Sequence, residues 1–313
     1  MIAKQIAMRD AYGEALLELA PVIPELVVLD ADVSSSTKTA AFGKKYPERF
    51  FNVGVAEANM VDIAAGLATC GLRPTVNTFA LFIALKGLDQ VRNIIAYNNI
   101  PVVLMGTYAG LSDSYDGASH QSITDLAIMR SMPNMTVVVP GDAIEVRQAL
   151  ETALHHNGPT FIRIGRNPTP VIFSDMPPLE IGKIRKIKEG TDLTIAVCGV
   201  PASMAINAAD NLIKEGISVD LIEISTLKPI DSETLVASAK KTGRILTVEE
   251  HTIFGGLGSA VAETLSKYYP VKIDMIGIQD RFAESGDYTA LLYKYGISEE
   301  HIEKRAKLLL DKN

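Results

Sequence analysis

Residues 54–82 read GVAEANMVDIAAGLATCGLRPTVNTFALF, and this stretch decides the fold class. Its first part, from Glu57 to Gly71, consists mainly of small and apolar residues and predicts a largely buried helix. The run RPTVNTFA, residues 73–80, is typical of a strand and begins two positions after that glycine. A second apolar helical pattern then begins. Helix, strand and helix in this order favour a parallel sheet covered by helices on both faces.

The same alternation extends outward from this stretch. We expect a helix over 8–20 and a buried strand over 25–32. Further elements follow downstream: a helix over 81–99, strands over 101–106, 135–139 and 160–164, and helices from about 122 and over 143–156. The first predicted domain is therefore α/β and covers residues 1–167.

Residues 168–190 are rich in proline and charge and predict a linker. From Thr191 the alternation of strands and helices resumes, with an N-cap expected at Asp231 and a helix end at Gly243. We therefore expect a second, smaller α/β domain over 191–313, again with a mainly parallel sheet flanked by helices.

Composition narrows the classes of partner. The 313 residues are 47% hydrophobic, and 30 basic against 37 acidic side chains give a net charge of −7. Without a long basic run, nucleic acid and anionic membranes are poor partners, and a small molecule or another protein is favoured. Cys70 and Cys198 are expected to be buried thiols, and no signal peptide or membrane span is recognised, so we expect a cytoplasmic protein.

Glu57 stands at the head of the apolar helix. A first-turn acid that complements the helix dipole is the ordinary interpretation of such a residue. Its neighbours Val55 and Ala56, and the helix with little polar surface that follows, instead favour a carboxylate in a cleft or interface. A buried acid there needs a basic partner atom.

Two further motifs lie where predicted strands end. Phe79 and Phe82 form either part of the core or a platform for a planar heterocycle. The polar loop TYAGLSDSYDGASHQS, residues 107–122, contains Asp116 and His120, which could contact a substrate or simply cap the next helix. The five histidines show no metal-ligand spacing, so no metal site is predicted in this chain.

Two sets of residues could bind anionic groups. Arg9, the serines at 34–36 and Arg166 would form a phosphate clamp if the fold gathers them at one sheet edge. The run EEHTIFGGLGSAVAE, residues 249–263, imitates a dinucleotide-binding turn, but two glutamates stand where a pyrophosphate needs positive potential. Tight strand-to-helix packing is therefore favoured for that turn.

Taken together, these residues resemble the second and third domains of thiamine-diphosphate enzymes of the transketolase family, over nearly the whole chain. The segment RFFNVGVAEANMVDIAAGLA is similar to the family's pyrimidine-binding segment, with Glu57 in the place of its glutamate. In the family this acid hydrogen-bonds N1′ of the aminopyrimidine and so promotes loss of the proton from C2 of the thiazolium. The order GVAE, TFALF and DGASHQ is the strong part of the resemblance.

The resemblance also implies roles for individual positions. Cofactor contacts are implied for Glu57, Phe82, Phe79, Val55 and Asp32. Asp116 and His120, in DGASHQ, match a family loop that contacts donor-sugar hydroxyls. Sugar-phosphate contacts are implied for Arg166, Arg9, Ser36 and Tyr108, although Tyr108 and Leu85 replace a histidine and an aromatic residue of the family.

A GDG motif, which anchors the diphosphate through Mg²⁺ in the family, does not occur in this sequence. We therefore expect Mg²⁺ and the diphosphate on a separate N-terminal transketolase subunit with that motif, and thiamine diphosphate shared between the two chains in an α2β2 assembly. The expected reaction moves a two-carbon ketol unit from a ketose phosphate to an aldose acceptor. Three alternatives remain: a subunit like 1-deoxy-D-xylulose-5-phosphate synthase, a subunit like the β chain of a 2-oxo-acid dehydrogenase, and a non-catalytic assembly subunit.

Overall fold

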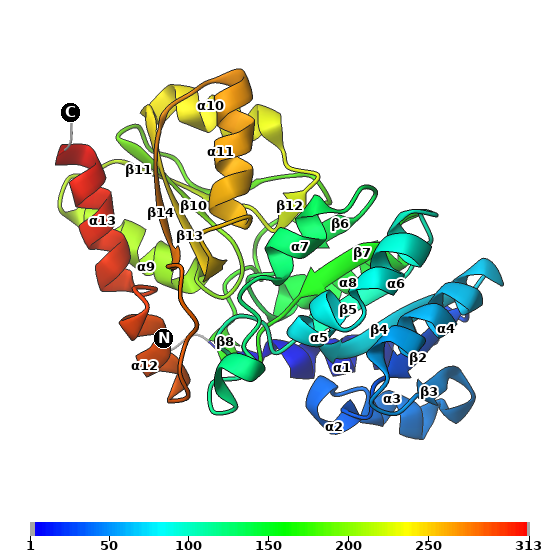
Figure 1. Ribbon diagram of the computed structural model, residues 1–313. Helices are drawn as coiled ribbons and strands as arrows, with labels where there is room; N and C mark the ends of the chain where they lie inside the picture. Colours follow the sequence, from blue (N-terminus) through cyan, green and yellow to red (C-terminus); the bar gives the residue numbers. More distant parts are fainter. Residues whose placement is uncertain (1–3, 312–313) are drawn as a thin grey trace.

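The computed structural model describes residues 4–311, which form two α/β domains (Figure 1). The strands of the first sheet are β2 (Leu26–Asp30), β3 (Phe50–Asn52), β4 (Arg73–Phe79), β5 (Val103–Thr107), β6 (Thr136–Val138), β7 (Thr160–Arg163) and β12 (Thr226–Lys228). Their order in space is β12-β6-β7-β5-β4-β2-β3, and every neighbouring pair except β12–β6 is parallel. The predicted α/β class is confirmed.

Helices cover both faces of this sheet, which explains its unbroken apolar strands. On β2, Val27 and Leu29 join one core cluster while Leu26 and Val28 join another, because successive side chains point to opposite faces. The helices of the first domain are α1 (Met8–Leu19), α2 (Ser34–Thr37), α3 (Ala40–Lys45), α4 (Glu57–Thr69), α5 (Ala80–Leu85), α6 (Leu88–Gln90), α7 (Asp125–Ser131) and α8 (Ala143–His155).

The single helix expected over 81–99 is wrong, because the segment is broken into α5, α6 and a π-helical turn at Val91–Ala96. The break falls at Gly87, where a Cβ atom would lie 3.2 Å from the Ile83 carbonyl oxygen and 3.3 Å from Val61 Cγ2. The close approach of α4 therefore favours glycine at this bend.

The predicted linker contains a short strand near each end. β8 (Pro168–Pro170) pairs with β1 (Gln5–Ala7), and β9 (Arg185–Lys188) adds an antiparallel edge strand to the second sheet. In the opposite direction β12, from the second half of the chain, extends the first sheet beside β6. Of these strands, β12 joins the two domains through backbone hydrogen bonds, whereas β8 and β9 attach the predicted linker to the first and the second domain. Periodicity within one segment does not predict such pairings.

The second domain holds a five-stranded sheet in the order β14-β13-β10-β11-β9. Its remaining elements are β10 (Leu193–Val197), α9 (Ala202–Lys214), β11 (Val219–Glu223), α10 (Ser232–Thr242), β13 (Arg244–Thr252), α11 (Leu257–Tyr268), β14 (Lys272–Ile278), α12 (Tyr288–Lys294) and α13 (Glu299–Asp311). The predicted ends of α10 are confirmed: the Asp231 side chain accepts from Thr234 N, and Gly243 is left-handed at φ 71°.

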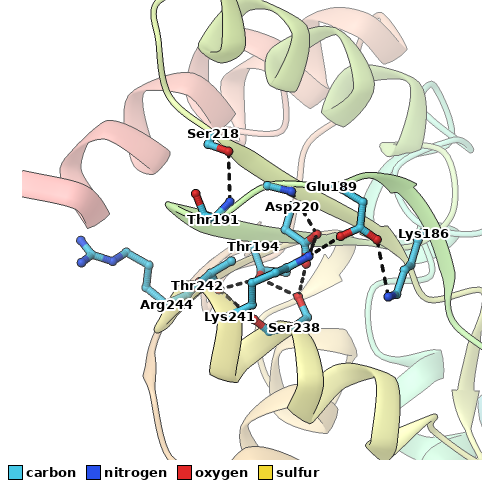
Figure 2. Close-up of polar contacts among 11 residues, drawn as sticks. Lys186, Glu189, Thr191, Thr194, Ser218, Asp220, Ser238, Lys241, Thr242 and Arg244 are labelled. Carbon is cyan, nitrogen blue, oxygen red and sulfur yellow. Dashed lines mark hydrogen bonds and ion pairs between the residues drawn. The ribbon is translucent and has the colours of Figure 1, made fainter.

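A polar cluster fixes α10 to the second sheet (Figure 2). Buried Asp220 accepts hydrogen bonds from the Ser238 hydroxyl and from Lys241 Nζ, and the same lysine reaches exposed Glu189. The Thr194 hydroxyl lies 2.7 Å from that of Ser238. Because these polar groups are hydrogen-bond partners of one another, the packing of α10 on the sheet explains the cluster.

The two cysteines, both expected to be buried, differ in exposure. Cys198 is buried, but Cys70 is exposed, because it follows α4 as its C-cap and lies beyond the helix face that packs on the sheet. Within residues 4–311, no helix combines the length and apolar character that crossing a membrane requires.

Candidate functional site

The predicted site residues gather at the carboxyl edge of the first sheet. Asp32 follows β2, Phe79 ends β4, Tyr108 follows β5 and Arg166 lies just beyond β7. These four strands are neighbours in the sheet order, so their carboxyl ends form one continuous edge. Ligands of parallel α/β sheets bind at such edges.

Glu57 is the first residue of α4 and is only 5% exposed. Its Oε1 atom lies 3.1 Å from Lys86 Nζ, which supplies the basic partner that a buried acid needs. Lys86 was not predicted to be a site residue. The available signal was its position four residues after Phe82, which places the two on one face of a helical turn.

Three aromatic side chains connect Glu57 to the rest of the site. Lys86 Nζ lies 4.0 Å from the centroid of the Phe82 ring, and Phe82 stacks on Phe79 with 5.6 Å between centroids. Phe79 in turn stacks on Tyr108 at 4.3 Å. We call Phe82, Phe79 and Tyr108 the aromatic row. His120 meets Phe82 edge-on at 5.4 Å, so the DGASHQ loop also reaches this row.

At the far end of the row, two guanidinium groups flank one phenol ring. Arg9 and Arg166 lie 5.4 and 5.2 Å from the centroid of Tyr108, and Arg9 Nη1 also donates a hydrogen bond to the Tyr108 hydroxyl. We call these three residues the arginine pocket. Tyr108 adopts a left-handed backbone at φ 57°, which costs energy for a bulky residue and is a common feature of functional sites.

Ser36, for which a phosphate contact was predicted, lies next to Arg9 through its backbone. Arg9 Nη1 donates to the carbonyl oxygen of Ser36 at 3.4 Å, rather than to the serine hydroxyl. Val55 is 71% exposed, and Asp32 accepts a hydrogen bond from Asn52, away from the aromatic row. Val55 and Asp32 therefore stand outside the contacts that unite the other predicted residues.

Asp113 belongs to the site although its sequence context assigned it no role. Its carboxylate is buried, lies 3.6 Å from Arg166 Nη1, and accepts no hydrogen bond from residues 4–311. Burial, followed by the like charge of exposed Asp116, raises the pKa of Asp113 to about 6, against the opposing effects of His120 and Arg166. A carboxylate thus stands beside the arginine pocket.

The second domain braces the DGASHQ loop. Gly286 N donates to the Ser114 carbonyl at 2.9 Å, and Gln121 Nε2 donates to the Glu284 carbonyl at 3.1 Å. Gly117 has φ 75°, and a Cβ atom there would lie 2.4 Å from Ser285 Oγ, so the motif needs its glycine.

A buried ionic network, which the sequence did not predict, contacts the same loop at Leu111 and Ser122. Arg163 Nε lies 2.7 Å from Asp125 Oδ2, and its Nη2 donates to the carbonyls of Ser122 and Glu250. The Glu250 side chain accepts from Leu111 N at 2.7 Å, and burial raises its pKa to about 7. The network spans both domains, so its members are far apart in sequence.

The turn that imitated a dinucleotide site is explained by packing. The backbone amides of Leu257 and Gly258 at the start of α11 donate to Glu249 at 2.7 and 2.8 Å. A protein carboxylate therefore takes the place that a pyrophosphate would need. Within residues 4–311, no group of three or more His, Cys, Asp or Glu side chains is arranged to hold a metal ion.

Comparison with known proteins identifies the family of both domains. Residues 4–171 match the transketolase pyrimidine binding domain, and residues 182–302 match the transketolase C-terminal domain. The chain is 43% identical to a protein of Methanocaldococcus jannaschii described as a transketolase C-terminal section, covering 95% of this chain and 94% of the relative. It is 38% identical to a 6-deoxy-6-sulfo-D-fructose transketolase subunit of Clostridium sp., covering 96% and 93%.

Two further similarities bear on the family. A solved split-gene transketolase, in an inactive β4 tetramer, superimposes with a TM-score of 0.91 at 46% identity, covering 97% of this chain and 98% of that one. The 1-deoxy-D-xylulose-5-phosphate synthase of Desulfotalea psychrophila is 37% identical, covering 96% of this chain and 47% of the synthase. With both of its domains matched, this chain belongs to the transketolase family.

Proposed function

We propose that this chain is the C-terminal subunit of a thiamine-diphosphate-dependent transketolase, which transfers a two-carbon ketol unit from a ketose phosphate to an aldose acceptor. A separate subunit carries the GDG motif, Mg²⁺ and the diphosphate. One observation carries the proposal: the aromatic row connects a buried carboxylate, Glu57, to an arginine pocket at the same sheet edge.

The residues present fit the pyrimidine half of the cofactor. A buried carboxylate suits a ring nitrogen that shares a proton, and a half-buried phenyl face suits a planar heterocycle. Thiamine diphosphate, when bound, supplies a carbanion at its thiazolium ring. Glu57 would hydrogen-bond N1′ of the pyrimidine, and Phe82 and Phe79 would contact its ring. Val55, which is exposed, would face the interface between subunits.

The loop and the arginine pocket fit the substrate. Asp116 and His120 would bind donor hydroxyls, and His120 is fixed by its contact with Phe82 and by a 2.9 Å hydrogen bond with the Ser119 hydroxyl. Arg9 and Arg166 would bind an anionic terminus through directed N–H groups, with the Tyr108 hydroxyl as a further partner. The second domain would then serve to position the loop.

The assembly is part of the proposal. The cofactor would lie between this chain and the diphosphate-binding subunit, and copies of this chain would also contact one another, giving α2β2. The similarity to a split-gene transketolase whose chains form a β4 tetramer supports self-association. A cytoplasmic location belongs to this proposal.

A second candidate function is a condensation like that of 1-deoxy-D-xylulose-5-phosphate synthase, which a relative at 37% identity supports. Pyruvate dependence would identify it. A subunit like the β chain of 2-oxo-acid dehydrogenases would also depend on a 2-oxo acid, whereas a non-catalytic assembly subunit would leave the activity of the complex insensitive to changes at Glu57.

The proposal is tested by titrating thiamine diphosphate and Mg²⁺ calorimetrically into this chain, alone and after mixing with a chain that carries GDG. Binding by the mixture alone, followed by ketol transfer without pyruvate, is the expected result. Tight magnesium-dependent binding by this chain alone would contradict the division of the site.

A further inference from the structure

A negative charge that opposes an anionic ligand lies beside the arginine pocket. Asp113 is fully buried, and its carboxylate lies 3.6 Å from Arg166 Nη1. That distance exceeds the length of a normal hydrogen bond, and neither carboxylate oxygen accepts one from any residue in 4–311. A buried charge of this kind is poorly screened by water and salt.

We propose that Asp113 determines the specificity of the site for the substrate terminus: its carboxylate opposes the second negative charge of a phosphate, so the pocket discriminates less strongly in favour of phosphorylated sugars than two arginines alone would. The inference rests on the proposed function, because it assigns the arginine pocket to the substrate terminus. Asp113 would distinguish substrates by the negative charge of that terminus.

A purely orienting role for Asp113 is the competing interpretation. Arg166 has independent anchors: its backbone N–H donates to the Ser112 hydroxyl at 3.1 Å, and its guanidinium lies over the Tyr108 ring. Without a directed hydrogen bond, Asp113 contributes little to the position of Arg166. What it supplies is negative charge, close to a guanidinium whose side chain is 37% exposed and available to a ligand.

Asp116 adds a second acid to the same region. Burial is the largest cause of the raised pKa of Asp113; the charge of Asp116 raises it further, whereas His120 and Arg166 lower it. Because Asp113 is buried beside Arg166, removing its charge should favour the dianionic terminus by at least about three- to tenfold, since two unit charges about 4 Å apart interact by roughly this much even at the dielectric of water.

The test compares wild type with Asp113→Asn in the reconstituted two-chain enzyme at pH 7.5, above the pKa of about 6 of Asp113. The donors are a five-carbon ketose phosphate and the same ketose without its phosphate. Asp210→Asn, which removes one carboxylate from α9 in the second domain, is the matched control. We expect Asp113→Asn to lower KM for the phosphorylated donor about three- to tenfold and to leave KM for the unphosphorylated donor unchanged.

A higher KM for the phosphorylated donor would overturn the inference in favour of the orienting role. Equal changes for both donors would overturn it in favour of a structural role. Calorimetric titration of sodium sulfate into the chain alone provides a readout without catalysis, and tighter binding by Asp113→Asn than by wild type is expected. Absence of ketol transfer from the wild-type complex would refute the proposed function, and the sulfate titration would still decide the effect of Asp113, with unchanged or undetectable binding by the variant counting against it.

Discussion

Lys86 Nζ lies 3.1 Å from Oε1 of Glu57 and 4.0 Å from the centroid of the Phe82 ring. One flexible side chain thus contacts both the acid and the aromatic face that the pyrimidine of thiamine diphosphate would use. Lys86 is 47% exposed on its side chain, so it can leave this position at modest cost. The lysine is therefore the partner that satisfies the buried acid.

Replacing Glu57 by Gln should lower kcat of the two-chain enzyme by at least about a hundredfold, because a neutral amide cannot share a proton with a ring nitrogen. Steady-state ketol transfer measures the effect. Glu14→Gln, at an exposed position on α1, is the control that should keep wild-type activity. Unchanged activity in Glu57→Gln would favour the non-catalytic assembly subunit.

Replacing Lys86 by Met should tighten binding of thiamine diphosphate to the two-chain enzyme by about two- to fivefold, because the cofactor no longer displaces a half-exposed ion pair. Calorimetry with Mg²⁺ present measures the dissociation constant. Lys214→Met, at an exposed position of α9, serves as the charge-matched control. Weaker binding in Lys86→Met would mean that the lysine itself contacts the cofactor.

Asp220→Ala should lower the free energy of unfolding by about 2–4 kcal/mol, because Ser238 and Lys241 lose a buried acceptor. Glu189→Ala removes the second carboxylate that contacts Lys241, but that side chain is 67% exposed, so the cost should stay below about 1 kcal/mol. Urea unfolding of both variants checks the contrast. Equal losses would show that burial does not determine how much each carboxylate of this cluster (Figure 2) contributes to the free energy of unfolding.

His251 should make the protein less stable in acid. Burial lowers the pKa of His251 from its ordinary 6.5 to about 4, so below pH 6.5 the unfolded chain binds a proton that the folded chain does not. Stability from this group is complete above pH 6.5 and is lost as the pH falls toward 4. Its neighbours Glu249 and Glu250, whose pKa values burial raises to about 7, oppose this trend by losing stability as the pH rises from 4.5 to 7.

The variant His251→Gln isolates the histidine. Between pH 7 and pH 5, wild type should lose about 2 kcal/mol more stability than the variant, since each pKa unit corresponds to 1.36 kcal/mol. Urea unfolding at the two pH values provides the comparison. Parallel losses in the two proteins would contradict a neutral, buried histidine.

Much of the fold could be predicted, and several candidate site residues could be identified, because their signals are local. The unbroken apolar run of β2 indicated a strand buried on both faces, and Asp231 and Gly243 marked the two ends of α10. The positions of Glu57, Phe79 and Phe82 followed from the order of motifs along the chain. These features depend on neighbouring residues and on side-chain periodicity, which a sequence displays directly.

The tertiary structure decided which of these groups meet and which charges are buried. Lys86 and Glu57 are 29 residues apart. Arg163 in β7 contacts Asp125 in α7 and the carbonyl of Glu250 in β13, so three separate elements meet there. The crossing of β12 into the first sheet likewise depends on a distant partner strand. Composition and spacing determined the strands, the helices and the candidate chemistry. The burial of Asp113 and its distance from Arg166 depended on packing between distant segments, since burial and charge pairing are properties of the assembled fold.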